Sequence, residues 1–316
     1  MGLLEFDFMR RALVAAVLVG VTAPAIGTFL VQRRLSLMGD GIGHIALTGV
    51  ALGFLLGTTP VLTAIVVAVL GAVAIELVRE RGKASGDVAL ALLFYGGIAG
   101  GVLLIGLSPG RSSTTLVGYL FGSLSSVSSS DLVVIGGLSA AVLLAVTVFF
   151  RELFAVCLDE EVARVSGLPV RFLNLLVAVG AAVTVTVAMR VVGLLLVSAL
   201  MVVPVAAAQQ LTRSFRATLL WACLVGVLAS LSGLVLAFYA DVAPGAATVV
   251  LALAVFFVAA LLGQARTAVS RGPSDRGVNA PPANGPPSPP RCRGRTVSPA
   301  RRPCTSSSGR RARASA

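Results

Sequence analysis

Residues 12–32 read ALVAAVLVGVTAPAIGTFLVQ, and no charged side chain interrupts them. A helix needs about 20 such residues to cross the hydrocarbon core of a bilayer, so this stretch is long enough for one membrane span. Similar apolar runs follow along most of the chain, and we therefore predict an all-α polytopic membrane protein. The candidate spans are residues 10–32, 36–57, 60–78, 87–107, 131–150, 172–189, 191–210, 217–239 and 245–263.

The number of transmembrane helices is eight or nine, because one pair of candidates is ambiguous. Only Arg190 separates residues 172–189 from residues 191–210. The pair forms either a tight hairpin of two helices or one long broken helix.

The composition excludes an ordinary soluble protein. Hydrophobic residues make up 57% of the chain and charged residues 12%, with a mean hydropathy of +0.97. A soluble domain carries roughly 25% charged residues. The same abundance of hydrophobic residues excludes disorder for most of the chain, because disordered segments are poor in such residues.

The net charge of +12 lies almost entirely in a C-terminal tail. Residues 1–265 hold 14 Lys and Arg against 12 Asp and Glu, whereas residues 266–316 hold 11 Arg and one Asp. The tail is rich in Pro, Ser and Arg and cannot form a core. We therefore divide the chain into a transmembrane domain, 1–265, and a disordered basic tail, 266–316. An extension without function is the preferred interpretation, contact with anionic membrane lipids is the alternative, and no nucleic acid partner is expected.

The basic residues also predict the orientation in the plasma membrane. With the N-terminus outside and nine spans, ten Lys and Arg fall in cytoplasmic loops and four fall outside, as the positive-inside rule requires. The C-terminal tail then lies in the cytoplasm. The outer loop 108–130 is Ser-rich, and residues 115–124 within it could form a short re-entrant or interfacial helix.

The cytoplasmic loop 151–171 holds the densest charge of the membrane domain. Within it, residues 158–169 read LDEEVARVSGLP. This pattern predicts a short charged helix that ends at Gly167 and Pro169, because Gly and Pro commonly terminate helices.

Asp40 and His44 are the best candidates for chemistry inside the membrane, where ionisable groups are rare and usually functional. They are four residues apart, a spacing that places both on one helix face, and Thr48 continues that face. If the span starts near Ser36, His44 lies eight residues, or roughly 12 Å, into it. Imidazole and carboxylate ligands suit Zn²⁺ or Mn²⁺. The alternative is a buried His that an Asp merely holds in place.

Other polar or helix-breaking residues are assigned mostly to structure. Glu76 and Asp87 flank a cytoplasmic loop and are expected to pair with its basic residues. Asp131 and Asp241 lie at predicted outer ends of spans, where acids are tolerated and could help to receive a cation. Pro204 removes a helix hydrogen bond and can kink its span, and this kink serves either gating or packing alone.

Two absences bear on the class of protein. The chain contains no G-x-x-x-x-G-K-[ST] phosphate loop, so it cannot bind ATP by that route. Its single His lies in a predicted span, and no pair of its four cysteines has CxxC spacing. A hydrolytic enzyme, a disulfide framework and a structural zinc site are therefore not expected.

Three segments in this order resemble the permease subunits of ABC importers for zinc, manganese and iron. The resemblance extends over about residues 8–264. The segments are FLVQRRLSLMGDGIGHIALTGVALGFLLG at 29–57, LDEEVARVSGLP at 158–169 and VVGLLLVSALMVVPVAAA at 191–208.

The resemblance implies a transport subunit that is not itself an enzyme. Two permease copies form the pore, two separate ABC ATPase subunits dock on the cytoplasmic side and use ATP, and an extracytoplasmic metal-binding protein delivers the ion. In such permeases an acid and a His of the second span are associated with the metal path, and they match Asp40 and His44. Asp159, Ala163 and Gly167 match the coupling helix that contacts the ATPase.

The expected cargo is zinc first, or manganese, with no permanently bound cofactor. Alternatives are an ABC permease for iron, for an iron-siderophore or for another cofactor, and a stand-alone secondary transporter or channel. A structural membrane scaffold is a further alternative. Against a secondary transporter, the sequence has no evident inverted repeat and few intramembrane charges for ion coupling.

Overall fold

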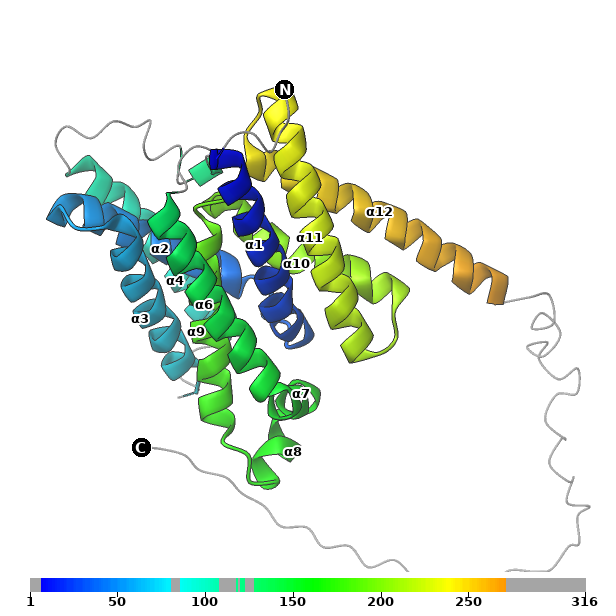
Figure 1. The fold of residues 1–316 in the computed structure, drawn as a ribbon. Coiled ribbons are helices and arrows are strands. Elements are labelled where there is room, and N and C mark those ends of the chain that lie inside the picture. The colour runs from blue at the N-terminus through cyan, green and yellow to red at the C-terminus, as the bar shows by residue number, and fades with distance from the viewer. Residues whose placement is uncertain (1–6, 81–85, 108–117, 119, 123–127, 271–316) are drawn as a thin grey trace, which may run out of the picture. The chain divides into compact units, whose positions relative to one another are not determined.

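The computed structural model describes residues 7–80, 86–107, 118, 120–122 and 128–270. Within these ranges, α-helices are the only regular elements (Figure 1). The helices are α1 (Asp7–Gln32), α2 (Met38–Leu56), α3 (Pro60–Glu80), α4 (Gly86–Gly106), α6 (Ser129–Val148), α7 (Phe150–Leu158), α8 (Glu160–Val165), α9 (Val170–Ala188), α10 (Leu194–Leu211), α11 (Phe215–Ala240) and α12 (Pro244–Ser270).

Each predicted span coincides with one of these helices. Seven of them, namely α1, α2, α3, α6, α9, α11 and α12, are long and apolar enough to cross a membrane. The apolar stretches of α4 and α10 are shorter, at residues 90–106 and 196–211. The prediction of an all-α polytopic membrane protein is therefore confirmed.

The ambiguous pair of spans forms two separate helices, α9 and α10. A turn at residues 189–193 divides them, and Gly193 adopts a left-handed φ of 90°. Helix α10 then packs chiefly against α12, α11 and α1, with few contacts to α9. The pair is therefore neither one long broken helix nor a tight hairpin.

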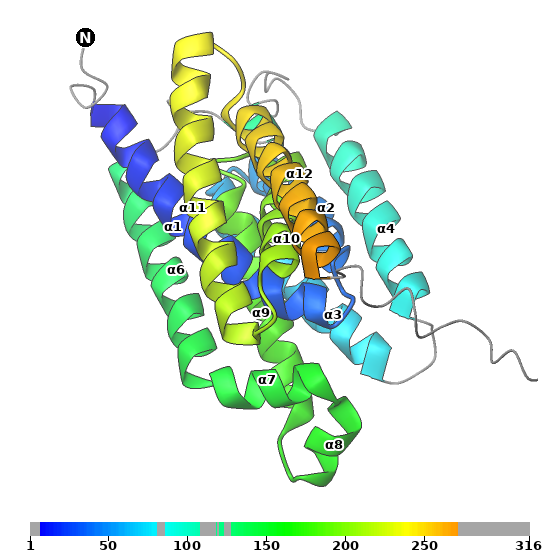
Figure 2. The same cartoon turned by 90° about the vertical axis from the view of Figure 1, so that its right-hand side faces the viewer.

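The spans form two groups that meet at α1 and α9 (Figures 1 and 2). Helices α2, α3 and α4 pack against one another, and so do α10, α11 and α12. Helix α1 contacts α11, α10, α6 and α9, whereas α9 contacts α3, α1, α2 and α6. Helix α2, which carries Asp40 and His44, therefore faces three neighbours besides α3, namely α4, α9 and α10.

Helix α1 is the most deeply packed span of the bundle. Its residues from Thr22 to Leu30 are all buried, and the fully buried Phe29 contacts the rings of Phe150 and Phe215 at centroid distances of 6.3 and 5.4 Å. Close approach of α1 to α11 requires glycine, because a Cβ at Gly226 would overlap the backbone of Gly20.

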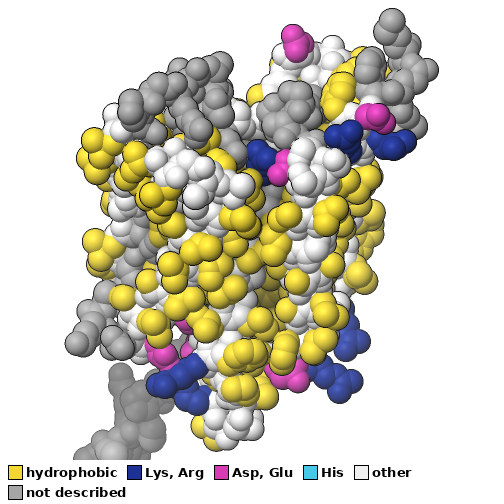
Figure 3. Space-filling view, turned by 60° about the vertical axis from the view of Figure 1, so that its left-hand side comes forward, with side chains coloured by type: hydrophobic (Ala, Val, Ile, Leu, Met, Phe, Trp, Pro, Cys, Tyr) yellow, Lys and Arg dark blue, Asp and Glu magenta, His cyan; other side chains and the backbone are white. Residues whose placement is uncertain are grey.

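The surface is consistent with a bilayer around the bundle. Hydrophobic side chains cover the middle of the face in Figure 3, and charged side chains gather toward its two ends. Helices α3 and α6 expose large apolar side chains, namely Leu62, Val66 and Leu70 on α3 and Val133 and Leu144 on α6. Exposed apolar side chains on membrane spans face lipid at no cost.

One end of the bundle collects the segments that the sequence assigns to the cytoplasm. The turn after α1, the end of α3 and the short helices α7 and α8 lie at this end, whereas the start of α6 and the end of α9 lie at the other (Figure 1). Which end faces the cytoplasm stays a prediction.

Most of residues 115–124 lie outside the described residues, and so does the tail from residue 271. Helix α12 continues to Ser270.

Candidate functional site

Helix α2 presents Asp40 in its first turn and His44 one turn later. The His44 Nε2 atom lies 3.9 Å from Asp40 Oδ1, and the two side chains are 12% and 31% exposed. The predicted common helix face is therefore confirmed. Since α2 begins at Met38 rather than near Ser36, His44 lies six residues, or roughly 9 Å, into the helix.

Ser198 of α10 adds a third polar side chain to this pair. Its hydroxyl donates a hydrogen bond to Asp40 Oδ1, with an O–O distance of 3.3 Å. This residue was not predicted from the sequence. The available signal was that Ser198 is the one polar side chain of residues 191–208, but a contact across 158 positions cannot be inferred from local spacing.

Helix α4 packs against His44. The Phe94 ring meets the imidazole edge-on at a centroid distance of 4.4 Å. The His44 Nδ1 atom is buried and has no hydrogen-bond partner among the described residues. Thr48 lies one turn after His44 in α2, as predicted, but its hydroxyl donates to the carbonyl of Gly97 in α4 at 2.7 Å rather than to Asp40.

The metal-binding capacity of this cluster is small within one chain. Asp40, His44 and Ser198 offer a carboxylate, an imidazole and a hydroxyl. The described part of the chain contains no group of three or more His, Cys, Asp or Glu that could hold a metal ion. Zn²⁺ usually takes four ligands, and Mn²⁺ takes octahedral oxygen-rich sites, so water or a second chain must complete the coordination of either ion.

The predicted short charged helix is present as α8. The Asp159 carboxylate caps it by accepting hydrogen bonds from the amides of Glu161 (2.9 Å) and Val162 (3.1 Å). Ala163 is 3% exposed and faces the bundle. Gly167, with a φ of 80°, ends the helix in the left-handed conformation that favours glycine. The role of Asp159, Ala163 and Gly167 in ATPase coupling stays a prediction.

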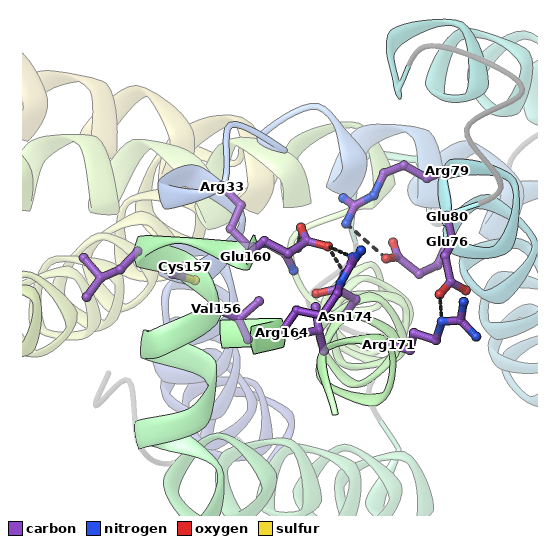
Figure 4. A pocket seen from close by; sticks show the side chains of 12 residues that line it. Arg33, Glu76, Arg79, Glu80, Val156, Cys157, Glu160, Arg164, Arg171 and Asn174 are labelled. Carbon is purple, nitrogen blue, oxygen red and sulfur yellow. Dashed lines mark hydrogen bonds and ion pairs between the residues drawn. The ribbon is translucent and has the colours of Figure 1, made fainter. Parts of the chain in front are cut away.

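Charged side chains surround a cavity of about 450 Å³ beside α8 (Figure 4). Glu160 accepts hydrogen bonds from Arg33 at 3.2 Å and from Arg164 and Asn174 at 3.3 Å each. Glu76 pairs with Arg79 at 3.0 Å, as predicted. Glu80 pairs with Arg171. The central residue of this cluster, Glu160, and its partners were not predicted from the sequence.

Cys157, at the end of α7, lines the same cavity. Burial raises the pKa of its thiol to about 11, although the nearby Arg33 guanidinium acts in the opposite direction. The thiol therefore stays protonated at neutral pH, whereas metal ligation requires the thiolate. This environment suits a role of Cys157 as a small apolar residue.

The remaining candidates have structural partners or lie on the surface. Asp131 forms a capping box with Ser128 and an ion pair with Arg190 at 2.6 Å. The exposed Asp241 terminates α11 with a left-handed φ of 51°. Helix α10 continues through the buried Pro204, so a kink and a gating role there stay predictions. The side chain of Asp87 lies outside what the structure describes.

Comparison with known proteins agrees with this architecture. The chain is 35% identical over 257 residues to the manganese import system permease protein ScaB of Streptococcus parasanguinis, covering 81% of this chain and 91% of that protein. It is 34% identical over 257 residues to the chelated iron transport system membrane protein YfeD of Yersinia pestis, covering 81% and 86%.

A solved structure, PsaBC from Streptococcus pneumoniae in complex with Fab, has a similar fold. The TM-score is 0.74 at 34% sequence identity, and the match covers 82% of this chain and 92% of that chain. The model of the ABC 3 transport family matches residues 5–263, which include every predicted span, the Asp40 cluster and α8. The chain belongs to the ABC 3 transport family.

Proposed function

We propose that this chain is the membrane-spanning permease subunit of an ATP-driven importer of divalent metal ions. The observation that carries the proposal is the cluster of Asp40, His44 and Ser198, which lies inside a bundle of this family. Ionisable side chains in a membrane span are costly and by default mark a transport path. The buried, unpartnered Nδ1 of His44 supports a role beyond packing.

Manganese is the preferred cargo. A carboxylate, a hydroxyl and one imidazole form an oxygen-rich donor set, which suits Mn²⁺ at least as well as Zn²⁺. One of the two relatives described above is named for manganese import and the other for chelated iron transport. These names support iron as the second candidate, whereas the preference for zinc from the sequence has no support from them.

The cytoplasmic face supports docking of a separate ATPase at α8. Leu158, Val162 and Val165 are exposed there although they are apolar, and Val165 is 90% exposed. The chain has no phosphate loop of its own, so we assign ATP hydrolysis to that partner. The permease is a transport component rather than an enzyme, and it needs no resident cofactor.

The working assembly contains two permease copies. The three donors of the Asp40 cluster are too few for a divalent ion, and a second copy brings a second set toward the same path. An extracytoplasmic metal-binding protein delivers the ion to the outer end. In this arrangement the N-terminus lies outside, the tail 266–316 lies in the cytoplasm, and residues 1–265 form the permease domain.

Uptake of radioactive manganese, iron(II) and zinc into vesicles tests this function. The vesicles contain the chain, its ATPase and the binding protein, and His44→Ala is compared with wild type and with Thr48→Val. We expect ATP-dependent manganese uptake that His44→Ala abolishes. Thr48→Val should retain uptake, because that hydroxyl bonds to α4.

The outcomes separate the alternatives. Uptake without ATP indicates a secondary transporter, and uptake of none of the three ions points to a chelate or another cofactor. Normal uptake by His44→Ala would remove this residue from the path.

A further inference from the structure

Glu160 joins three elements at the cytoplasmic end of the bundle. It is the first residue of α8, and its carboxylate bonds to Arg33 from the turn after α1, to Arg164 of α8 and to Asn174 of α9. Figure 4 shows these side chains converging beside the cavity. Two of the three contacts therefore tie the short helix α8 to other elements, namely the turn between α1 and α2 and the span α9.

Arg33 stands next to the element that carries the candidate metal site. It lies in the turn between α1 and α2, seven positions before Asp40. This turn is tight, because the amide of Leu35 donates to the carbonyl of Leu30 at 2.8 Å and Arg34 adopts a left-handed φ of 60°. Because this turn is short and hydrogen-bonded, a displacement of Arg33 also displaces the start of α2.

Of the two arginines that bond to Glu160, Arg33 is the buried one. The Arg33 side chain is 8% exposed and that of Arg164 is 66% exposed, whereas the Glu160 side chain that they share is 39% exposed. A buried guanidinium that loses its carboxylate is strongly unfavourable, but an exposed ion pair contributes little. The turn before α2 therefore depends on Glu160 far more than α8 depends on Arg164.

The surroundings allow this contact to move. The cavity of about 450 Å³ leaves space beside Glu160, and Ala163 is the one buried residue of α8, so few packed side chains oppose a shift of this helix. The hydrogen bonds of Glu160 can persist through a small shift of α8. A closely interdigitated apolar core would resist such a shift, because it packs well only in discrete arrangements.

We propose that Glu160 is a positioning residue that transmits movement of α8 through Arg33 to the start of α2 and so to Asp40 and His44. The inference rests on the proposed function, in which the ATPase moves α8. The structural observation behind it is independent of the cargo, because the link joins the two ends of the coupling path whichever metal is transported.

The test measures metal uptake and ATP hydrolysis in the same vesicles, which contain the full chain, its ATPase and the binding protein. The variants are Glu160→Gln, Arg33→Gln and the double variant, with Glu80→Gln as matched control. Glu80 lines the same cavity and pairs with Arg171, whose side chain is 86% exposed. The control pair therefore joins α3 to α9 without involving α8 or the turn.

We expect each single variant to lower the number of manganese ions taken up per ATP hydrolysed by about tenfold, with hydrolysis within about twofold of wild type. The double variant should lower this ratio no further than either single variant does, because both substitutions break the same Arg33–Glu160 contact. Glu80→Gln should keep the wild-type ratio.

The inference fails if wild type transports and Glu160→Gln has the same ratio, or if the two single losses multiply in the double variant. The absence of ATP-dependent uptake by wild type would instead contradict the proposed function. If Glu160→Gln does not assemble with the ATPase, a second double variant is used, in which Arg33→Glu and Glu160→Arg exchange the two charges and so restore the ion pair. Failure of that variant to assemble as well assigns Glu160 to folding and overturns the inference.

Discussion

Ser198 brings a hydroxyl from α10 to the Asp40 carboxylate of α2. A side chain that bonds to a metal-binding carboxylate fixes its orientation, and removal of such a partner typically weakens metal binding by roughly 10- to 100-fold. We expect Ser198→Ala to raise the KM for manganese uptake by about tenfold. Ser198→Thr, which keeps the hydroxyl, is the matched control. Initial uptake rates over a range of manganese concentrations provide the measurement, and equal KM values for Ala and wild type would contradict this role.

The same small cluster explains why residue spacing was informative only in part. Asp40 and His44 share a face because both belong to one helix, so four positions sufficed to predict their proximity. Thr48 has the same spacing but bonds to Gly97 of α4 instead. Which hydroxyl joins the cluster depends on the neighbouring helix, and no local pattern encodes that choice.

Among the elements, α8 depends on the backbone of Gly167. Its φ of 80° strains a β-branched residue by roughly 1–2 kcal/mol, and a Cβ there would meet nothing within 4 Å. We therefore expect Gly167→Val to fray the end of α8 and to lower co-purification with the ATPase, while Gly167→Asn, which tolerates this conformation, behaves as wild type. Full co-purification and transport by the Val variant would contradict a coupling role for this turn.

The contact between α1 and α11 provides a second test at the scale of helices. A Cβ at Gly226 would overlap Gly20, whereas a Cβ at Gly137 of α6 would meet nothing within 4 Å. We expect Gly226→Ala to destabilise the bundle by about 1–3 kcal/mol through overpacking. Gly137→Ala should be neutral or stabilise it by up to about 1 kcal/mol, because Ala favours helix. Thermal unfolding of the purified proteins in detergent measures both, and similar melting temperatures would contradict the packing argument.

For the whole molecule, the basic tail is the part that we expect transport to tolerate losing. Helix α12 continues to Ser270, so a stop codon after Ser270 removes residues 271–316, which are nearly all of the tail, and spares the last span. We expect the truncated chain to insert, to assemble with its ATPase and to transport manganese at the wild-type rate in vesicles. A loss of transport that returns when anionic lipid is increased would instead indicate an electrostatic contact with lipid headgroups.

The apolar spans and the short charged helix α8 were predictable from the sequence, because the bilayer core requires long apolar runs and Gly and Pro interrupt helices locally. The matching boundaries of α1, α3 and α11 show this directly. These properties depend on residues that are close together in the chain.

Three features depend on packing between helices. They are the separation of α10 from α9, the hydrogen bond from Ser198 to Asp40 and the contacts of Glu160 with its partners. The Ser198–Asp40 and Arg33–Glu160 contacts join residues 158 and 127 positions apart. Packing creates such contacts, since the same apolar faces could pair in several ways. Residues close together in the chain thus specify the spans and the Asp40–His44 face, whereas packing between helices specifies the third group of the cluster and its connection to α8.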